Sequence, residues 1–476
     1  MCIRDSGDMK ASKIQLTSIE DASRRFDPSY HLSDAIVVKK TIAKSPYPLL
    51  KLKEVSSGIF NGGRYKRVYV SNPKHGYKFL SSSDILAADL ESVKMVSKRY
   101  MGGVKELALE KGWILITRSG TIGKTAFANA KHAQKLASED VIRLKPNNIL
   151  RAGAIYAYLA SKYGYILLTQ GTFGAVIQHI ECPFVGEIPI PNFPKTLQES
   201  IDLLIQESAR LRESAADELE AADKLLKKKA GLRSLTPEDY DYFGQHSATR
   251  KPSCFTRKVS EFGSITFNAF NNSERIKAII SSIPESHLTI KDVIENGETF
   301  SSTGAPSIEV KPHCGIMLIN QKDIFDTIVT GKYISRRGVK TDNLVKYGEV
   351  LIASDGTLGE NETFCRAIYA NEDLEGAFIS SHFIRMKSND KVPAGYLYCW
   401  LNSDYGFRLI RRTQAGTKIC HPINRMFLDI PVPILAKEDM NKIDRMVRNA
   451  HTKRHLANEK ELKAIAMVEA EIEKWN

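Results

Sequence analysis

The segment RSGTIGKT, residues 118–125, has the residue types of a phosphate-binding loop. Such a loop reads G-x-x-x-x-G-K-[ST], lies between a strand and a helix, and cradles phosphate oxygens with backbone N–H groups. With Gly123 and Lys124 at its end, the first glycine belongs at position 118, where Arg118 stands. Gly120 leaves two residues before Gly123, too few for the cradle. The spacing therefore predicts a glycine turn and no nucleotide site.

No other segment combines the residues of a catalytic centre. A methyltransferase acting on a base amino group needs a [DNS]PP[YF] segment and a glycine-rich cofactor loop. The nearest match, DPSY at residues 27–30, lacks the second proline. The adjacent pairs His313-Cys314 and Cys420-His421 could hold a metal, but neither lies in a CxxC or HExxH frame, so core or surface positions are expected. The sequence predicts no catalytic residue, no cofactor and no metal ligand.

The glycine turn occurs twice in the chain. ASDGTLGENETF, residues 353–364, repeats at positions 356–359 the GTxG pattern of positions 120–123. Glu360 stands where the first copy has Lys124, and a carboxylate at that place would repel phosphate. An apolar run precedes both turns, so each copy is expected to form a strand, a glycine turn and a second strand.

Further segments repeat at a similar distance. The matched pairs are residues 76–85 with 315–324, 138–145 with 380–387, 152–164 with 394–406, 169–172 with 413–417, and 187–194 with 429–435. A unit of about 240 residues is too long for a solenoid repeat. The pattern predicts a tandem duplication of a whole domain.

Each copy ends in a long helical stretch, the first at about residues 195–230 and the second at about 437–475. Apolar residues recur at spacings of three and four, as in a helix that packs on another helix. The expected seam residues are Leu197, Ile201, Leu204, Leu211 and Leu219 in the first helix, and Ile443, Ile465 and Ile472 in the second. The same stripes also contain Ser208, Ala215 and Ala222 in the first helix and Ala450 in the second. We expect the two helices to pack antiparallel and to form a coiled-coil spacer.

These elements predict an α/β (α+β) fold with two duplicated domains and two long helices. The expected divisions are a leader at residues 1–22, a first domain at 23–194, a central helix at 195–231, a linker at 232–261, a second domain at 262–435 and a C-terminal helix at 436–476. No apolar run is long enough for a membrane span. The seven cysteines form no CxxC pair, which is typical of a reducing cytoplasm.

The net charge of +13 lies outside the helices, because residues 195–230 and 436–476 carry net charges of −1 and +1. Basic globular domains on a neutral helical frame favour a nucleic-acid partner. Arginine can read guanine, and lysine mostly holds phosphate. The candidate DNA-binding residues are Arg64, Tyr65, Lys66, Arg67, Lys98, Arg99 and Arg118 in the first copy, and Lys332, Tyr333, Arg336, Arg337, Lys340, Arg411, Arg412 and Lys418 on expected loops of the second. A solvated surface charge is the alternative for each single position.

Together these segments resemble the specificity (S) subunits of type I restriction–modification systems. The resemblance rests on RSGTIGK, ASEDVIRLKP, YLASKYG, GEIPIPNFPKTLQESI and the opening RRFDPSYH at residues 24–31. It implies two target recognition domains, each reading one half of a split double-stranded DNA target. It also implies a helical spacer that docks two DNA methyltransferase subunits, with motor-nuclease subunits outside, and a subunit without catalysis or cofactor.

The second copy departs from the family pattern at two places. It loses the basic residue after GTxG, and residues 262–310 match the first copy poorly. Two other functions stay open: the specificity subunit of a combined type II-like restriction–methylation enzyme, and a helical scaffold with no DNA role. A neighbouring methyltransferase gene would separate the scaffold from the other two. A helix of about 36 residues, ~54 Å long, favours half-sites about one DNA turn apart with a short unread gap.

Overall fold

The computed structural model describes residues 16, 19, 28–31, 33–172, 179–236, 239, 254–261, 265–306 and 308–475. As expected, helix and sheet are mixed along the chain. The expected leader at 1–22 lies outside the described residues except for Leu16 and Ile19, and so do residues 24–27 of the family-like opening. Most of the expected linker, residues 237–253, also lies outside them except for Asp239.

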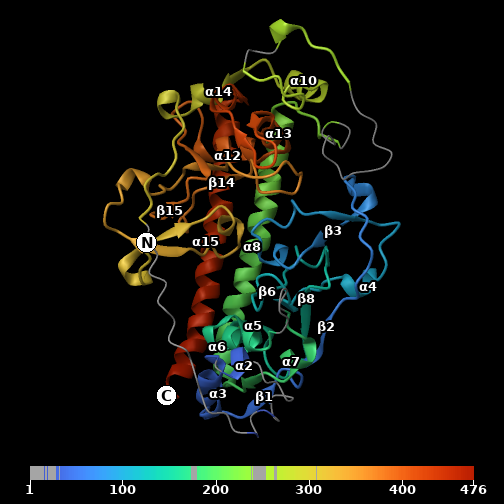
Figure 1. Cartoon of the computed structure of the whole chain (residues 1–476), viewed down its shortest axis with the longest axis vertical. Coiled ribbons are helices and arrows are strands. Elements are labelled where there is room, and N and C mark those ends of the chain that lie inside the picture. The colour runs from blue at the N-terminus through green and yellow to red at the C-terminus, as the bar shows by residue number, and fades with distance from the viewer. Residues whose placement is uncertain are drawn as a thin grey trace.

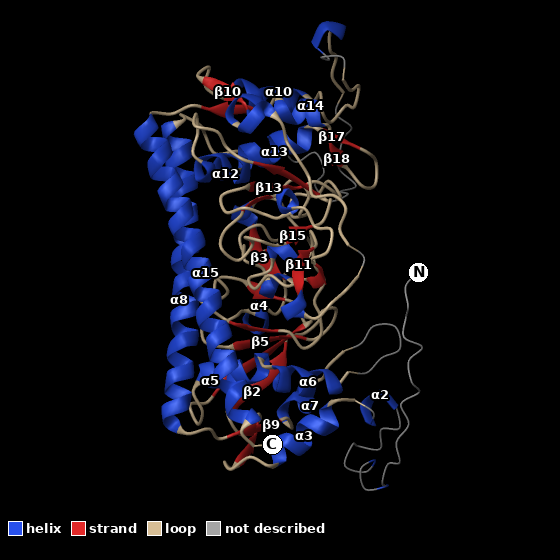
Figure 2. Cartoon of the chain, turned by 90° about the vertical axis from the view of Figure 1, so that its left-hand side faces the viewer, coloured by secondary structure: helices blue, strands red, loops and turns tan. Residues whose placement is uncertain are grey.

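Two long helices, α8 (Lys195–Lys229) and α15 (Lys437–Glu473), run side by side along the longest axis of the molecule (Figure 1). Their ion pairs join Glu207 to Lys460 at 2.5 Å and Glu218 to Lys453 at 2.6 Å. Partner numbers fall along α15 as they rise along α8, so the helices are antiparallel. The two halves of the chain lie on one side of this pair, stacked along its length (Figure 2).

Small residues line the contact between α8 and α15. The fully or almost fully buried positions that recur every seven residues are Ile201, Ser208, Ala215 and Ala222 on α8, and Ile443, Ala450, Ala457 and Ala464 on α15. Ser208 donates to the carbonyl of Ala457 at 2.8 Å. This register places Ala215 opposite Ala450, and side chains this small let two helix backbones approach closely.

The seam expected from the sequence is therefore only partly right. Ile201, Ile443 and Ile472 are buried, whereas the remaining candidates are half-buried: Leu197, Leu204, Leu211, Leu219 and Ile465. Apart from Leu211, these half-buried side chains pack at the edges of the domain cores. The small residues Ser208, Ala215, Ala222 and Ala450, which lie on the same predicted stripes, are the buried ones at the contact.

The first half contains two sheets. One has the order β2 (Ser56–Asn61), β8 (Val141–Pro146), β5 (Ile114–Thr117) and β6 (Thr125–Phe127), with antiparallel neighbours. The other has the order β4 (Met95–Ser97), β3 (Gly76–Leu80) and β7 (Leu136–Ala137), and β3 and β7 are parallel. A ribbon of β1 (Leu49–Lys51) with β9 (Pro189–Pro191) completes the strands. The helices are α2 (Pro28–His31), α3 (Ala35–Ala43), α4 (Val104–Leu107), α5 (Ala152–Ala160), α6 (Lys162–Gln170) and α7 (Cys182–Gly186).

The second half repeats this strand pairing. Its sheets are β14 (Ala367–Tyr369), β13 (Val350–Ala353) and β16 (Phe383–Met386), and β12 (Lys332–Ser335), β11 (Gly315–Ile319) and β15 (Phe378–Ile379), with β11 and β15 parallel. Two ribbons pair β10 (His287–Thr289) with β19 (Pro431–Pro433), and β17 (Gln414–Ala415) with β18 (His421–Pro422). The helices are α10 (Glu274–Ser281), α11 (Ile290–Val293), α12 (Ala394–Asn402), α13 (Asp404–Arg412) and α14 (Asn424–Leu428).

The halves differ where their sequences match least. Strand β2 forms a full ladder with β8 in the first half. In the second half, only single bridges take its place among the described residues, from Phe300 to Arg385 and from Ile294 to Ser388. The poor match at residues 262–310 thus coincides with a missing edge strand.

A glycine at the start of α5 and of α12 lets each helix press against the long pair. The Gly153 N–H donates to Asp202 Oδ1 at 2.7 Å, and the Gly395 N–H donates to Asp444 Oδ1 at 2.8 Å. A Cβ at Gly153 or Gly395 would lie within 2.7 Å of the same carboxylate. The two glycines occupy equivalent positions of the matched helices, and each bonds an aspartate of its own long helix, so the two halves are mounted on the helices in the same way.

Each half builds its larger core against one end of the helix pair. Ile205 of α8 and Val468 of α15 share the first core with α5. Leu226 of α8 and Ile443 of α15 share the second core with α12. The helix pair is therefore part of both cores and fixes the position of each half. No described helix has both the length and the apolarity to cross a membrane.

The halves also touch each other directly, midway along the helix pair. The Ala88 N–H donates to the Phe325 carbonyl at 2.9 Å, and the Thr327 N–H donates to the Leu86 carbonyl at 2.7 Å. In the repeat, Leu86 corresponds to Phe325 and Ala88 corresponds to Thr327. Exchanging the two halves therefore converts each hydrogen bond into the other. We call residues 86–88 and 325–327 the clasp. Its reciprocal bonds relate the halves by a local two-fold axis.

Charges support the clasp from both sides. Burial and the neighbouring Asp323 raise the pKa of Asp326 to about 6, while Lys322 and Lys124 act in the opposite direction. Lys124 belongs to the first half, so this electrostatic contact crosses between the halves. Arg454 of α15 donates to the Ala88 carbonyl at 3.2 Å and ties the clasp to the helix pair.

A cysteine pair tests the clasp. Ala87 and Asp326 face each other in its antiparallel bridge, and such Cα atoms are about 4.5–5.5 Å apart, within the range of a disulfide. Ala87→Cys with Asp326→Cys is expected to form a disulfide under mild oxidation, measured by mass spectrometry of the joined peptides. Ser83→Cys with Asp326→Cys is the control, and equal rates for the two pairs would show that the halves do not meet here.

Candidate nucleic-acid interface

The glycine turn at residues 118–124 joins two antiparallel strands, β5 and β6, as the sequence predicted. Gly120 and Gly123 have φ values of 75° and 78°, which glycine adopts without strain. Lys124 is followed by a strand, so the helix N-terminus that a phosphate-binding loop needs is missing at this turn. The Lys124 ammonium lies 5.1 Å from the ring centroid of Tyr165 on α6.

Strand pairing corrects the alignment of the two turns. The Thr117 N–H donates to the Lys124 carbonyl at 2.9 Å, and the Ala353 N–H donates to the Arg366 carbonyl at 3.1 Å. Arg366 is therefore the counterpart of Lys124, and the second turn is longer than the first. The expectation that the second copy loses this basic residue is wrong. Glu360 belongs to the inserted residues and does not replace Lys124.

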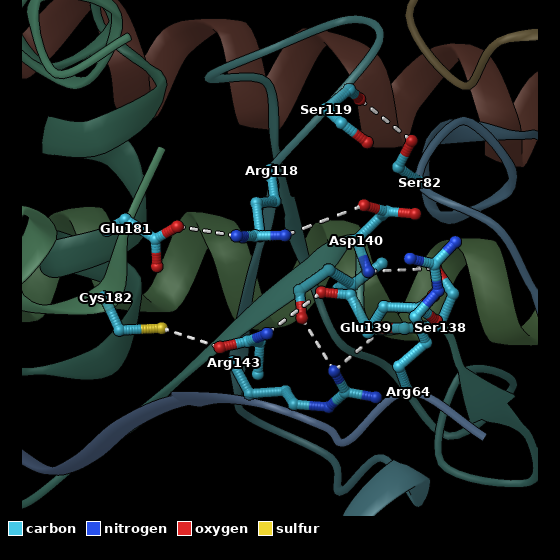
Figure 3. A network of polar contacts seen from close by, with 12 residues as sticks. Arg64, Ser82, Arg118, Ser119, Ser138, Glu139, Asp140, Arg143, Glu181 and Cys182 are labelled. Atoms are coloured by element: carbon cyan, nitrogen blue, oxygen red, sulfur yellow. Dashed lines mark hydrogen bonds and ion pairs between the residues drawn. The ribbon is translucent and has the colours of Figure 1, made fainter. Parts of the chain in front are cut away.

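In the first half, two adjacent carboxylates gather arginines from separate loops (Figure 3). Glu139 pairs with Arg67 and lies 3.7 Å from Arg64 Nε. Arg118 lies 4.0 Å from Asp140 and forms a 2.6 Å ion pair with Glu181 of the α7 segment. Three of the predicted DNA-binding residues thus lie together. The Arg64 side chain is 91% exposed and free to reach a polyanion.

The same basic pair follows equivalent strands in both halves. Ser97 of β4 pairs with Gly76, and Ser335 of β12 pairs with Gly315. The next two residues are Lys98-Arg99 in the first half and Arg336-Arg337 in the second, and all four are exposed. We call these four residues the strand-end basic pairs. The strand register therefore matches residues 97–100 of the first half with residues 335–338 of the second.

Aromatic rings accompany the first strand-end basic pair. Lys98 Nζ lies 5.6 Å from the ring centroid of Tyr77, and the Arg99 guanidinium lies 5.4 Å from that of the exposed Tyr100. Tyr65 donates to Glu106 at 2.8 Å, and its ring packs on Gly103. The remaining first-half candidate, Lys66, is exposed beside them.

The second-half candidates are more scattered. Lys332 Nζ lies 3.4 Å from Glu309, and Tyr333 is half-buried on β12. Lys340 and Lys418 are exposed on different loops. These positions remain predictions, because exposure alone does not assign a DNA contact.

Two expected loop residues lie on helix α13 instead. Arg411 is 2% exposed and donates to Glu360 at 2.6 Å. Arg412 is half-buried, and its Nε donates to the Asn271 carbonyl at 3.4 Å. A buried guanidinium cannot reach DNA without local unfolding, so the assignment of Arg411 to a DNA-binding loop is wrong. The helix places its side chain inward.

The sequence reading missed a histidine pair at the matching place in the second half. Asp355 accepts from both His382 and His421, and both imidazoles are more than half exposed. His382 is the counterpart of Asp140 in the matched segments 138–145 and 380–387. Aligning these segments residue by residue would have found this position.

The matching loops thus carry different chemistry in the two halves. In the first half, Ser82 donates to the Ser119 carbonyl at 3.0 Å, and in the second, Gln321 donates to the Asp355 carbonyl at 2.6 Å. The backbone frame is shared, but one site presents arginines with carboxylates and the other presents imidazoles around one carboxylate. Among the described residues, no cluster of three or more His, Cys, Asp and Glu side chains is arranged to hold a metal ion.

The arginine of the repeated VIRLK and FIRMK strands lies inside each half. Arg143 donates to the carbonyls of Ser138, Val141, Ala137 and Leu107, at 2.6–3.1 Å. Arg385 is fully buried and pairs with the buried carboxylate of Glu349 at 2.8 Å. Both arginines hold the loops that carry the exposed residues, and neither is available to a ligand.

Comparison with known proteins defines the class. Residues 47–202 match the family described as Type I restriction modification DNA specificity domain. The resemblance predicted from the sequence is therefore confirmed for these residues.

Three solved structures also align with the chain. The type I restriction–modification S subunit from M. genitalium has 13% identity over 90% of this chain and 96% of its own, with a TM-score of 0.36. The HsdS subunit from Thermoanaerobacter tengcongensis has 13% identity over 90% of this chain and 96% of its own, with a TM-score of 0.27. The type IIG restriction endonuclease BpuSI aligns with 13% identity over 40% of this chain and 30% of its own, with a TM-score of 0.27. No curated protein sequence matches the chain.

Proposed function

We propose that this chain is a non-catalytic specificity subunit that reads a bipartite, asymmetric DNA target. It directs DNA methyltransferase subunits and motor-nuclease subunits to that target. The observation that carries the proposal is the strand-end basic pair, which occurs at the same structural position in a specificity domain and in its repeat.

The two halves act as target recognition domains, at residues 23–194 and 262–435. Lysine and arginine at a repeated position suit contacts to phosphate, which position a protein on DNA without reading sequence. The neighbouring loops differ, with Arg118 and Asp140 in the first half and His382 and His421 in the second. Different hydrogen-bonding groups recognise different base edges. The half-sites are therefore unlike each other, and the target is asymmetric.

The helix pair acts as the spacer between the halves. Its 35-residue first helix is roughly 53 Å long at 1.5 Å per residue. Half-sites on one face of B-DNA are about 34–36 Å apart, or one turn. Two-fold related halves mounted at opposite ends of the helix pair suit that distance, and the base pairs between them are unread.

The outer faces of the long helices suit partner subunits. Leu203 on α8 and Leu462 on α15 are large apolar side chains that stay exposed at one end of the helix pair, and they suit the docking of a methyltransferase subunit. The two-fold relation of the halves suits a second such subunit at the other end. We place the chain in the cytoplasm, because its six described cysteines form no disulfide. A combined type II-like enzyme would use the same recognition halves with a different partner chain.

Matched double variants test the proposal in the presence of the methyltransferase partner. Lys98→Ala with Arg99→Ala, and Arg336→Ala with Arg337→Ala, remove one strand-end basic pair each. Each double variant is expected to lower the slope of log K against log salt by up to about two. In selection from randomised duplexes, each should weaken preference for one half-site only.

The control is Lys442→Ala with Arg445→Ala, an exposed basic pair on α15, outside both recognition halves. It should leave the salt slope and both half-sites unchanged. Equal effects of all three double variants would show that the basic pairs have no special part in DNA binding.

A further inference from the structure

The second half contains a cluster of guanidinium groups that the proposed function does not use. Arg366, Arg408 and Arg411 surround the buried ring of Phe407, with their guanidinium carbons 3.8, 5.9 and 4.9 Å from its centroid. Glu360 accepts from Arg408 at 3.0 Å and from Arg411 at 2.6 Å. One carboxylate thus serves two charged guanidinium groups at the same place.

Arg366 has a further charged neighbour. Asp89 from the first half acts on its guanidinium electrostatically, while burial and the neighbouring arginines lower the pKa of Arg366 to about 10. The three guanidinium groups are therefore close enough to repel one another.

Arg408 and Arg411 line a small pocket. Ser273 and Arg275, at the start of α10, form part of its wall. Asp239 also lines the pocket, but its carboxylate is already held by Arg233 at 2.5 and 2.7 Å. The wall therefore combines three arginines, the carboxylates of Glu360 and Asp239, and the N-terminus of α10, where Ser273 accepts from the Ile276 N–H.

One edge of Arg411 is left without an acceptor. Nη1 donates to Glu360, whereas Nε and Nη2 are buried and have no hydrogen-bond partner in the part of the chain that the structure describes. These two N–H groups lie parallel on the same edge of the guanidinium plane. That edge is the fork with which arginine binds two oxygens of a carboxylate or phosphate. A buried donor without an acceptor is destabilising, so an oxyanion there would be stabilised.

We propose that this pocket binds a phosphoryl group through the Nε–Nη2 edge of Arg411. The oxyanion supplies negative charge and both missing acceptors. The first half lacks the site, because the counterparts of Arg408 and Arg411 on the equivalent helix α6 are Ile166 and Thr169. The site is separate from the strand-end basic pairs, so a test of phosphate binding does not depend on DNA recognition.

Thermal unfolding of the full chain in inorganic phosphate tests the site, with chloride at equal ionic strength as the reference. Phosphate is expected to raise Tm. Arg411→Lys keeps the charge but removes the two-donor edge, so the apparent phosphate affinity should fall about tenfold or more, as for lost hydrogen bonds to a charged group. The control Arg425→Lys, at an exposed position on α14, should leave the phosphate response unchanged.

Glu360→Gln is expected to change the phosphate affinity in the opposite direction to Arg411→Lys. It removes a negative charge beside the site, so phosphate should bind several-fold tighter, a gain that a damaged fold would not produce. A larger Tm shift with adenosine 5′-monophosphate than with phosphate would assign the phosphoryl group to a nucleotide, and an equal or smaller shift would assign it to free phosphate.

The proposal is wrong if phosphate changes Tm no more than chloride does, if acetate raises Tm as much as phosphate does, or if the Tm of Arg411→Lys responds to phosphate like that of the unchanged chain.

Discussion

Replacing Arg385 with methionine should lower the free energy of unfolding by about 3–5 kcal/mol, because it leaves a buried carboxylate without its partner. The Arg385 side chain is 0% exposed and that of Glu349 is 1% exposed. Besides the ion pair, Arg385 donates to Ser302 Oγ and the Asn343 carbonyl at 2.8 Å, and to the Leu344 carbonyl at 2.7 Å. Urea-induced unfolding of the full chain measures the loss.

Three matched variants separate the effect of the unpaired buried charge from the effects of the other lost hydrogen bonds. Arg143→Met removes the counterpart that bonds only to carbonyls, and should cost less, about 1–3 kcal/mol. Arg385→Met with Glu349→Gln should recover part of the loss, since no buried charge remains. Arg448→Met removes a guanidinium that is 46% exposed beside Asp444, so it should cost under about 1 kcal/mol. A loss for Arg385→Met no greater than for Arg448→Met would contradict the buried-charge account.

Enlarging the small seam between the long helices should have the second largest effect. Ala215→Leu and Ala450→Leu each insert a larger side chain where both alanines are fully buried. Overpacking of this kind typically destabilises by about 1–3 kcal/mol. Because both domain cores include the helix pair, the change should also loosen both halves together, which hydrogen exchange of the α5 and α12 segments would detect.

The control is Ala221→Leu, which makes the same change on the exposed face of α8. It should alter stability by less than about 0.5 kcal/mol. If Ala221→Leu destabilised as much as Ala215→Leu, the close approach of the helices at the alanine positions would be refuted.

The long helices could be predicted almost to the residue, because a helical period sustained over 35 residues is a strong signal. Their contact surface could be predicted in part. Ser208 and Ala215 lie on the predicted stripe and fit a close approach, but a hydrophobic pattern gives the larger leucines more weight. Leu204 gives a strong sequence signal but packs at the edge of the first domain core.

The repeat predicted a shared strand and turn, but the sequence pattern alone aligned the residue after the turn with the wrong counterpart. The GTxG pattern aligns Lys124 with Glu360, whereas the strands that follow the two turns align Lys124 with Arg366. The difference is an insertion in the second turn. Only strand pairing shows this correspondence, since the hydrogen bonds of the ladder fix which residues are opposite.

Charge could be read from the sequence, but its exposure could not. Arg336 and Arg411 look alike in basic segments, yet the first is exposed and the second is buried against Glu360. The histidines at Asp355 were missed because His382 and His421 lie far from each other in the sequence, and the fold brings them to one carboxylate.

The central claim is that the helix pair sets the distance between two half-sites. The measurement is the target selected from randomised duplexes, with the methyltransferase partner present, by the natural chain and by a chain with both helices lengthened. The lengthened chain duplicates residues 209–215 in α8 and 450–456 in α15, which adds about 10.5 Å at nearly unchanged helix phase. We expect the natural chain to select two different blocks centred about 10 bp apart, and the lengthened chain to widen the unread gap by about three base pairs. A single continuous block, or a gap that stays the same in the lengthened chain, would contradict the account.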